Sequence, residues 1–333
     1  MKISKIGEFG LIEEVIAPKF KELVNRHLTG IGDDAAIITI DEYTSHVYTT
    51  DMLIENTHFL RNKISAHQLG YKSLSVNLSD IAAMGANPVA SYLSIGLPKD
   101  MKVEWVEEFM QGYKSLSETF QVPLLGGDTT SSEDKIIVNV GVTGAMPSGN
   151  IKLRSAAREN DIVCLTGKVG GSAGGLQVIL NDLPVDHHAK KLLEQHLTPP
   201  PHISEGRWLS QFKAVHAMMD VSDGIASDLK HILNASALKG TIELEQIPIS
   251  EELIRQSEKY NWNPLELSVS GGEDYVLLLT VDQNEYKALA GKFRKKFSRP
   301  LYKIGFLEKG NPKIVYLKDK IEVKDLKEGY AHF

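Results

Sequence analysis

The feature that most constrains this chain is an acidic turn, MDVSDG at residues 219–224, which lies between an apolar segment and an amphipathic stretch. The segment 214–219 is apolar except for one histidine, and its length suits a buried strand. From Ile225 to Leu233, apolar residues recur with the spacing of one helix face. The sequence therefore predicts a strand, an acidic turn and a helix, which together aim side-chain oxygens and backbone N–H groups at a common point.

The side chains of this turn suit a hard cation that carries a phosphate. Asp220 and Asp223 supply two carboxylates, and Ser222 places a hydroxyl between them. The alternative is that Ser222 or Asp223 only caps the following helix. The recurrence of similar turns elsewhere in the chain favours the cation site.

Carboxylates follow glycines or predicted strands at several further places. These are GIGDD at 30–34, TTD at 49–51, GGDTT at 126–130 and SGGED at 270–274. If most of them converge, mutual repulsion raises their pKa values unless cations neutralise them. Aspartates without a cysteine or histidine cluster favour Mg²⁺, in more than one copy, together with a phosphorylated ligand. Because the chain has no P-loop lysine, the metals are expected to neutralise most of the charge in a phosphoryl transfer.

A long apolar helix is predicted between Ser65 and Gly85. It opens with the capping box SAHQ at 65–68 and carries Asn77 and Asp80 on one face. A carboxylate on so apolar a helix is costly to bury without a partner. Two interpretations stay open: a functional carboxylate, or a solvated face.

Length, net charge and cysteine content limit the domain organisation, the partners and the compartment that can be expected of the chain. At 333 residues the chain is expected to form two domains, 1–148 and 149–333, joined at the linker MPSGN, residues 146–150. A net charge of −6 and the lack of a Lys/Arg-rich block argue against nucleic acid and anionic membranes as partners. One cysteine, Cys164, excludes an internal disulfide and fits a reducing cytoplasm. Without a signal-like N-terminus or an apolar run of about 18 residues, we expect a cytoplasmic protein that does not span a membrane.

The glycine-rich stretch 167–175 allows a different interpretation. Residues 170–174 match G-x-S-x-G, the nucleophile motif of serine hydrolases, with Ser172 as the nucleophile. No histidine or acid can be assigned to it from the sequence. The glycines instead favour close packing of a helix on a strand, or backbone N–H groups that approach a phosphate. The stretch is not a P-loop, because no Gly-Lys-Ser/Thr follows a four-residue gap.

Taken in order, the motifs resemble those of the thiamine-monophosphate kinase family. The matching segments are Gly32-Asp33-Asp34-Ala35-Ala36, Thr50-Asp51-Met52-Leu53, residues 77–86, Gly126-Gly127-Asp128-Thr129, residues 220–224 and residues 270–275. The resemblance runs from about Gly7 to Phe333, nearly the whole chain. The family belongs to a larger group that also contains aminoimidazole ribonucleotide synthetase, selenophosphate synthetase and a hydrogenase-maturation protein.

The resemblance implies an α/β (α+β), two-domain PurM-like fold. The N-terminal domain would bind ATP and Mg²⁺ and form a β-barrel across a homodimer, and a C-terminal α/β domain would complete the active site. The implied reaction is the direct in-line transfer of a phosphoryl group from ATP to thiamine monophosphate, which gives ADP and thiamine diphosphate. The acceptor phosphate has a second pKa of about 6 and is largely ionised at neutral pH, so no general base is required.

Carried over motif by motif, the resemblance also implies roles for individual residues. The implied Mg²⁺ ligands are Asp33, Thr49, Thr50, Asp51, Asp80, Asp128, Asp220 and Asp223. Those implied to act directly in catalysis are Asp51, Asp128, Asp220 and Asp223. ATP contacts are implied for Gly127, Asp128, Arg154 and Ser222, and thiamine monophosphate contacts for His58, Glu273 and Tyr330.

Some relatives within the larger group are disfavoured by the chain itself. Selenophosphate synthetase needs a reactive Cys or selenocysteine with a Lys near its N-terminus, and the hydrogenase-maturation protein needs a Cys at its C-terminus; here neither feature is present. Aminoimidazole ribonucleotide synthetase stays an alternative, disfavoured by the Thr50-Asp51 and Gly-Gly-Glu-Asp segments. A non-catalytic nucleotide or metal sensor on the same fold is the other alternative.

Overall fold

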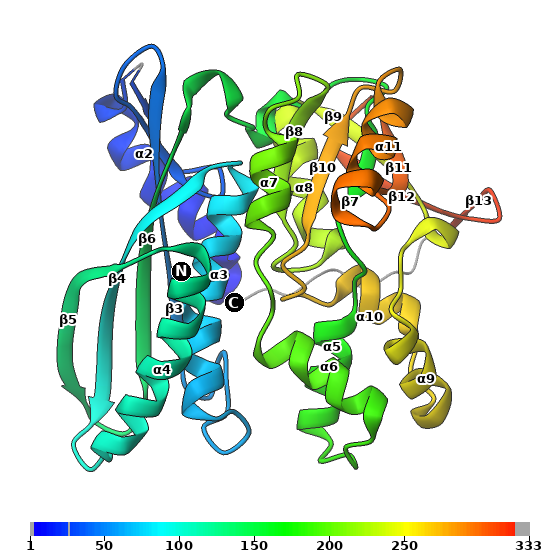
Figure 1. Cartoon of the computed structure of the whole chain (residues 1–333). Helices are drawn as coiled ribbons and strands as arrows, with labels where there is room; N and C mark the ends of the chain where they lie inside the picture. The colour runs from blue at the N-terminus through cyan, green and yellow to red at the C-terminus, as the bar shows by residue number, and fades with distance from the viewer. Residues whose placement is uncertain (1–2, 26, 324–333) are drawn as a thin grey trace.

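The structure is a computed structural model and describes residues 3–25 and 27–323. It contains two β-sheets, one formed by the first half of the chain and one by the second (Figure 1). The described strands up to Pro147 form a six-stranded sheet, and those from Ile162 onward form a seven-stranded sheet. The predicted α/β class is therefore confirmed.

The first sheet has the strand order β1-β2-β3-β6-β4-β5, and its neighbouring strands are antiparallel except β4 and β5. Its strands are β1 (Leu28–Thr29), β2 (Ala36–Thr39), β3 (Thr44–Ile54), β4 (Asn87–Pro98), β5 (Leu124–Ser132) and β6 (Ile137–Pro147). The long helices α3 (Ala66–Ala83) and α4 (Val103–Phe120) pack beside one another on one face of this sheet (Figure 1).

Helix α3 is the buried element that joins the two halves. Its predicted capping box is confirmed, because the Ser65 hydroxyl accepts from the Gln68 N–H at 3.1 Å and the Gln68 side chain accepts from the Ser65 N–H at 3.0 Å. The helix lies between the first sheet and the second half of the chain (Figure 1). Asn77 is consequently fully buried, so the interpretation of this helix face as solvated is wrong.

The second sheet has the order β13-β12-β9-β11-β7-β10-β8, with antiparallel neighbours except β9 and β12. Its strands are β7 (Ile162–Leu165), β8 (Val215–Asp220), β9 (Leu238–Glu243), β10 (Leu277–Val281), β11 (Tyr302–Lys309), β12 (Lys313–Lys318) and β13 (Ile321–Val323). The helices of this half are α5 (Gly171–Leu180), α6 (His187–Leu197), α7 (Ile203–Leu209), α8 (Ile225–Ser236), α9 (Glu251–Tyr260), α10 (Pro264–Ser270) and α11 (Tyr286–Phe297).

Short helical turns complete the secondary structure. Those before the first sheet are η1 (Ile3–Lys5), α1 (Gly7–Gly10), η2 (Leu11–Ile16), α2 (Ala17–Phe20) and η3 (Lys21–Leu23). The later ones are η4 (Ser148–Asn150), η5 (Arg154–Ala156) and η6 (Leu244–Gln246). η4 and η5 lie in the segment that leads from β6 to β7.

The hydrophobic core fixes α3 relative to strand β8. One buried cluster contains Leu78 and Ile81 of α3, Met84 directly after this helix, and Met218 of β8. A second cluster packs the predicted apolar face of α8 against the other face of the second sheet. Burial of such residues contributes roughly 1.5–3 kcal/mol each, so the α3–β8 contact is a stable platform. Residues at the ends of these two elements are held at a fixed separation.

Within the described part of the chain, the first sheet is open, with β1 and β5 as its edges. The barrel that the resemblance implies requires a second copy of the chain. Among the described residues, no helix has both the length and the hydropathy that a membrane span requires.

Candidate active site

The acidic turn 219–224 has the predicted strand–turn–helix geometry. Strand β8 ends at Asp220, Gly224 adopts a φ of +103°, and α8 begins at Ile225. The N-cap position of α8 is occupied by Gly224, so the interpretation in which Ser222 or Asp223 is the N-cap residue is wrong. The Asp228 carboxylate instead accepts from the N–H groups of Asp223 and Gly224, at 3.3 and 3.0 Å. These N–H groups are therefore not available to a ligand, and the side chains of the turn carry its chemistry.

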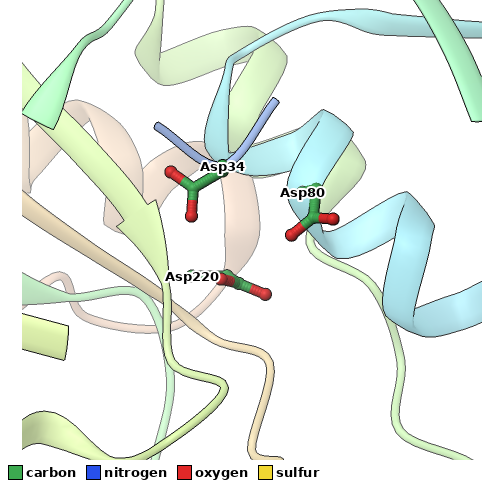
Figure 2. Close-up of side chains that lie close together, drawn as sticks. All are labelled: Asp34, Asp80 and Asp220. Carbon is green, nitrogen blue, oxygen red and sulfur yellow. The ribbon is translucent and has the colours of Figure 1, made fainter. Parts of the chain in front are cut away.

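Three carboxylates from distant parts of the chain meet at the end of β8. Asp34, Asp80 and Asp220 each place a carboxylate oxygen within 4.8 Å of the others. Figure 2 shows the three side chains around one space: Asp34 comes from the segment before β2, Asp80 from α3 and Asp220 from β8. The α3–β8 core contact holds two of these carboxylates, Asp80 and Asp220, in place.

Each carboxylate of the cluster is held by a neutral or cationic donor. Ser79 donates to Asp220 at 2.6 Å, and Thr49 donates to Asp80. Arg154 donates to one oxygen of Asp34 at 2.8 Å. The other oxygen of Asp34 is buried and has no hydrogen-bond partner in the part of the chain that the structure describes. A cation would relieve both the unsatisfied buried oxygen of Asp34 and the repulsion between the three neighbouring carboxylates.

The electrostatics of the cluster also call for a cation. Burial, followed by the charge of Asp34, raises the pKa of Asp220 to about 8. Burial and the charges of Asp51 and Asp220 raise the pKa of Asp80 well above its usual range, and burial raises that of Asp51 to about 6. Oxygen ligands of this kind and number fit Mg²⁺. The donor set therefore fits the metal that the sequence implies.

Asp34 is the member of this cluster that sequence reasoning assigned to no role. The motif match implied its neighbour Asp33 as a ligand, but Asp33 accepts from the backbone N–H of Arg154 at 3.0 Å. Burial, followed by the charge of Asp34, raises the pKa of Asp33 to about 7. In Gly-Asp-Asp, only the backbone path decides which carboxylate points inward, and no periodicity in the sequence reveals it.

A cavity of about 570 Å³ adjoins the cluster. Its lining unites many of the implied site residues, namely Asp51, His58, Asp80, Asp220, Ser222, Asp223 and Glu273. His58 accepts the Ile54 N–H on Nδ1 at 2.9 Å, so the neutral ring carries its proton on Nε2. The cavity thus combines carboxylates for a cation with polar groups for an organic ligand.

Of the adjacent threonines Thr49 and Thr50 in strand β3, only Thr49 reaches the cluster. Successive side chains of a strand point to opposite faces, so Thr49 and Asp51 share one face and Thr50 lies on the other. Thr50 is exposed and accepts from Asn139 at 2.9 Å. Asn77 of α3 accepts the Asp51 N–H at 3.0 Å and so fixes the end of the strand at the cavity. Sequence reasoning placed Asn77 on the right face but not in this positioning role.

Gly127 and Asp128 lie apart from the cluster. Both are exposed on edge strand β5, where they line a separate hollow of about 560 Å³ with residues of β4 and α4. Strands β6 and β4 separate β5 from β3, so Asp128 lies about 14 Å across the sheet from the position of Asp51. The remaining implied ligand residue, Tyr330, lies outside the described residues.

The structure does place a histidine and an acid beside Ser172. The Ser172 hydroxyl lies 2.9 Å from His196 Nδ1, and Glu273 Oε2 lies 3.4 Å from the same nitrogen. A hydrolase triad needs the nucleophile on one ring nitrogen and the acid on the other. Because both partners share Nδ1, the arrangement cannot relay a proton, and the serine-hydrolase interpretation has no geometric support.

The glycine-rich stretch serves packing rather than phosphate binding. The N–H groups of Gly170 and Ser172 donate to the Asp274 carboxylate at 2.5 and 3.0 Å. A Cβ at Gly175 would lie 2.3 Å from the Leu192 carbonyl oxygen, so α5 and α6 can approach only with glycine there. The sequence left open close packing of a helix on a strand; the close contact at Gly175 is instead between the two helices α5 and α6.

Comparison with known proteins agrees with this site. Residues 32–146 match the family described as AIR synthase related protein, N-terminal domain, and residues 158–318 match the corresponding C-terminal domain. The fold and the carboxylate-lined cavity thus define a protein of the AIR synthase related class.

Relatives that match over most of their length identify the family within this class. The chain is 36% identical to thiamine-monophosphate kinase of Bacillus subtilis, with 91% of this chain and 93% of the relative covered. It is 38% identical to that of Escherichia coli K12, with 85% of each chain covered. A solved structure titled "AaThiL complexed with AMPPCP and TMP" superposes with a TM-score of 0.86 at 33% identity, covering 100% of this chain and 99% of that one. The chain belongs to the thiamine-monophosphate kinase family.

Proposed function

We propose that this chain transfers the γ-phosphoryl group of ATP to thiamine monophosphate and so forms thiamine diphosphate. The observation that carries the proposal is the carboxylate cluster of Asp34, Asp80 and Asp220, which opens into a cavity with Glu273 and His58. Family relatives carry this activity in their names, and the solved relative holds AMPPCP and TMP. In the reaction, a phosphate oxygen of thiamine monophosphate bonds to the γ-phosphorus, and the bond to the β–γ bridging oxygen of ATP breaks.

The metal of this reaction is proposed to be Mg²⁺, held by the cluster with help from Asp51 and Asp223. Bound there, it would neutralise the charge on the transferring phosphates. The unpartnered oxygen of Asp34 and the raised pKa values of Asp80 and Asp220 support this assignment. Thr49, Ser79 and Arg154 hold the three carboxylates of the cluster in orientation, which is the preorganisation that such catalysis needs.

The organic ligands are proposed to occupy the cavity from two sides. Glu273 and His58 would meet thiamine monophosphate, and Ser222 and Arg154 would meet ATP. Both Glu273 and Ser222 line the cavity, and the Glu273 N–H donates to the Ser222 carbonyl at 2.7 Å. The two proposed ligand sites are therefore joined by one backbone hydrogen bond.

A homodimer is proposed because β5 is an edge strand of the first sheet and is exposed in the single chain. From Leu124 to Ser131 every residue of the strand is exposed, and Leu125 reaches 63% exposure. Among the described residues β5 has a strand neighbour on one side only, and an exposed strand edge of this kind is a liability that barrel closure removes. A second copy covering β5 would also bring Gly127 and Asp128 of one subunit towards the cluster of the other. In this arrangement residues 1–148 would provide dimerisation and most metal ligands, and residues 149–333 would complete the site.

The proposed setting is the cytoplasm. Cys164, the cysteine of the chain, is a free thiol and is buried in strand β7, which fits a reducing compartment.

The deciding experiment measures ADP release from ATP and Mg²⁺ with and without thiamine monophosphate, and identifies the product by mass. Release that depends on thiamine monophosphate, with thiamine diphosphate as product, supports the proposal. ADP release without that dependence would favour another ATP-using enzyme of the class, such as an aminoimidazole ribonucleotide synthetase. Nucleotide binding without turnover would favour a sensor.

The two adjacent aspartates of the Gly-Asp-Asp motif are expected to differ. Asp34→Asn should lower kcat about 10²-fold, since it removes a ligand oxygen from the cluster, whereas Asp33→Asn should cost less than about tenfold. Steady-state kinetics of the two matched variants at saturating Mg²⁺ test this difference. A larger loss for Asp33→Asn would show that Asp33, and not Asp34, is the ligand.

Mg²⁺ is expected to stabilise the protein more at high pH than at low pH. The folded pKa of Asp220, about 8, lies above the value of about 4 in an unfolded chain. The stability that the protonated group contributes is complete below about pH 4 and is lost as pH rises through about 8. A cation should offset this loss, so the rise in Tm on adding Mg²⁺ should be larger near pH 8 than near pH 5.5. Equal rises in calorimetry at both pH values would contradict a metal site built on Asp220.

A further inference from the structure

Lys72 is the most deeply buried cation beside the cavity. It lies on α3, two turns before Asp80, and its side chain is 2% exposed. Lysine is almost never fully buried unless it is paired, because an isolated ammonium is costly to remove from water. Its partner is Glu273, whose Oε1 lies 2.7 Å from Nζ. The pair links the helix of the first half to a loop of the second.

The backbone around Glu273 is held in an unusual conformation by the acidic turn. Glu273 has a φ of +63°, a left-handed value that costs a residue with a side chain. Its N–H donates to the Ser222 carbonyl at 2.7 Å, and a Cβ at Gly272 would lie only 2.3 Å from that carbonyl oxygen. The loop is therefore packed tightly on the turn, and this geometry directs the Glu273 side chain between α3 and the cavity.

The two oxygens of the Glu273 carboxylate have different surroundings. Oε1 is bound by Lys72, and Oε2 lies 3.4 Å from His196 Nδ1. Burial lowers the pKa of His196 to about 4, so this ring is neutral and does not compete with Lys72 as a cation. The Glu273 side chain is 28% exposed, and Glu273 and His196 line the cavity, whereas Lys72 sits behind them.

From this geometry we infer that Lys72 is a positioning residue, which fixes the Glu273 carboxylate towards the organic cation of thiamine monophosphate. The inference rests on the proposed function. The thiamine moiety carries a positively charged ring and an exocyclic amine, and an ionised carboxylate is the matching acceptor for both. Burial raises the pKa of Glu273, but the charge of Lys72, the hydrogen bond that Lys72 donates and the contributions of His196 and His58 together outweigh burial and keep the pKa below its usual value. Lys72 therefore maintains both the direction and the charge of Glu273 without touching the substrate.

The test compares Lys72→Met with Lys72→Arg in the full chain with Mg²⁺. Lys72→Met should raise the KM for thiamine monophosphate about 10–100-fold, the effect of losing a charge-assisted hydrogen bond, with little change in the KM for ATP. Lys72→Arg keeps the charge and should lie closer to wild type in the same measurement. Lys114→Met, which removes an exposed lysine paired with Glu118 on α4, is the matched control and should leave both KM values unchanged.

Lys72→Met removes the ion-pair partner of the partly buried Glu273, and a second variant keeps the test decisive if this change prevents folding. The double variant Lys72→Met/Glu273→Gln removes both charges, and it should also raise the KM for thiamine monophosphate selectively. A wild-type KM for thiamine monophosphate in either variant, or equal losses for both substrates, would overturn the inference. If the wild-type protein forms no thiamine diphosphate at all, the proposed function itself fails, which is a different result.

Discussion

Asp220→Asn is expected to lower kcat by about 10³-fold or more while leaving the fold intact. Strand β8, helix α3 and the segment before β2 meet at Asp220, and one of its carboxylate oxygens lies within 4.8 Å of oxygens of Asp34 and Asp80. An amide there is neutral, so the cluster would hold Mg²⁺ weakly and leave the phosphate charges uncompensated. The loss should therefore appear in the transition state more than in the binding of either substrate.

The fold should tolerate this change for a specific reason. With its pKa raised to about 8, Asp220 is mostly protonated near neutral pH before a cation binds, and asparagine has nearly the same shape as the protonated acid. The Ser79 hydroxyl can still donate to the amide oxygen. Thermal unfolding without Mg²⁺ should therefore give a Tm no lower than that of wild type. Asp100→Asn, a change at an exposed position after β4, is the control and should keep full activity. Near-wild-type turnover of Asp220→Asn would remove the metal model.

The secondary structure around the site could be predicted because local patterns determine it. The apolar run before Asp220 predicts β8, and the helical spacing after Gly224 predicts α8; both elements form within about one residue of the expected position. The Ser65 capping box marks the start of α3. In these segments the residue propensities, the turn residues and the spacing of apolar residues all indicate the same element. Each element is therefore specified by local sequence, before tertiary packing is considered.

Contacts that depend on three-dimensional packing could not be predicted in the same way. Asp34 and Asp33 are adjacent and chemically identical, and only the path of the backbone makes Asp34 the inward one. In the sequence Lys72 is an ordinary polar residue in an apolar helix. Only the structure brings Glu273 Oε1, some 200 residues later in the chain, to 2.7 Å from its Nζ. The Ser172 motif is the converse case: its local match suggested a hydrolase nucleophile that the sequence already disfavoured, and the shared Nδ1 contact gives that interpretation no support.

Asp128 lies apart from the other aspartates of the motifs. Several aspartates of the motifs line the cavity within one chain, but Asp128 lies on the exposed edge strand β5. If a second copy closes the sheet into a barrel, the two-fold symmetry that is usual for homodimers would place Asp128 of each subunit near the other subunit's site. Asp128→Asn should then be as inactive as Asp220→Asn, even though both positions need not belong to the same chain.

Mixed dimers of these two inactive variants are expected to regain activity. In a heterodimer, the Asp220 of the Asp128→Asn chain would face the intact Asp128 of the Asp220→Asn chain, which restores one complete site out of two. Co-expression with two different affinity tags isolates the heterodimer, and its turnover per dimer should be about half that of wild type. Homodimers of each variant, purified in the same way, are the controls. An inactive heterodimer would mean that Asp128 and Asp220 act within one chain, and the sheet would then have to curl so that β5 reaches the cluster of its own subunit.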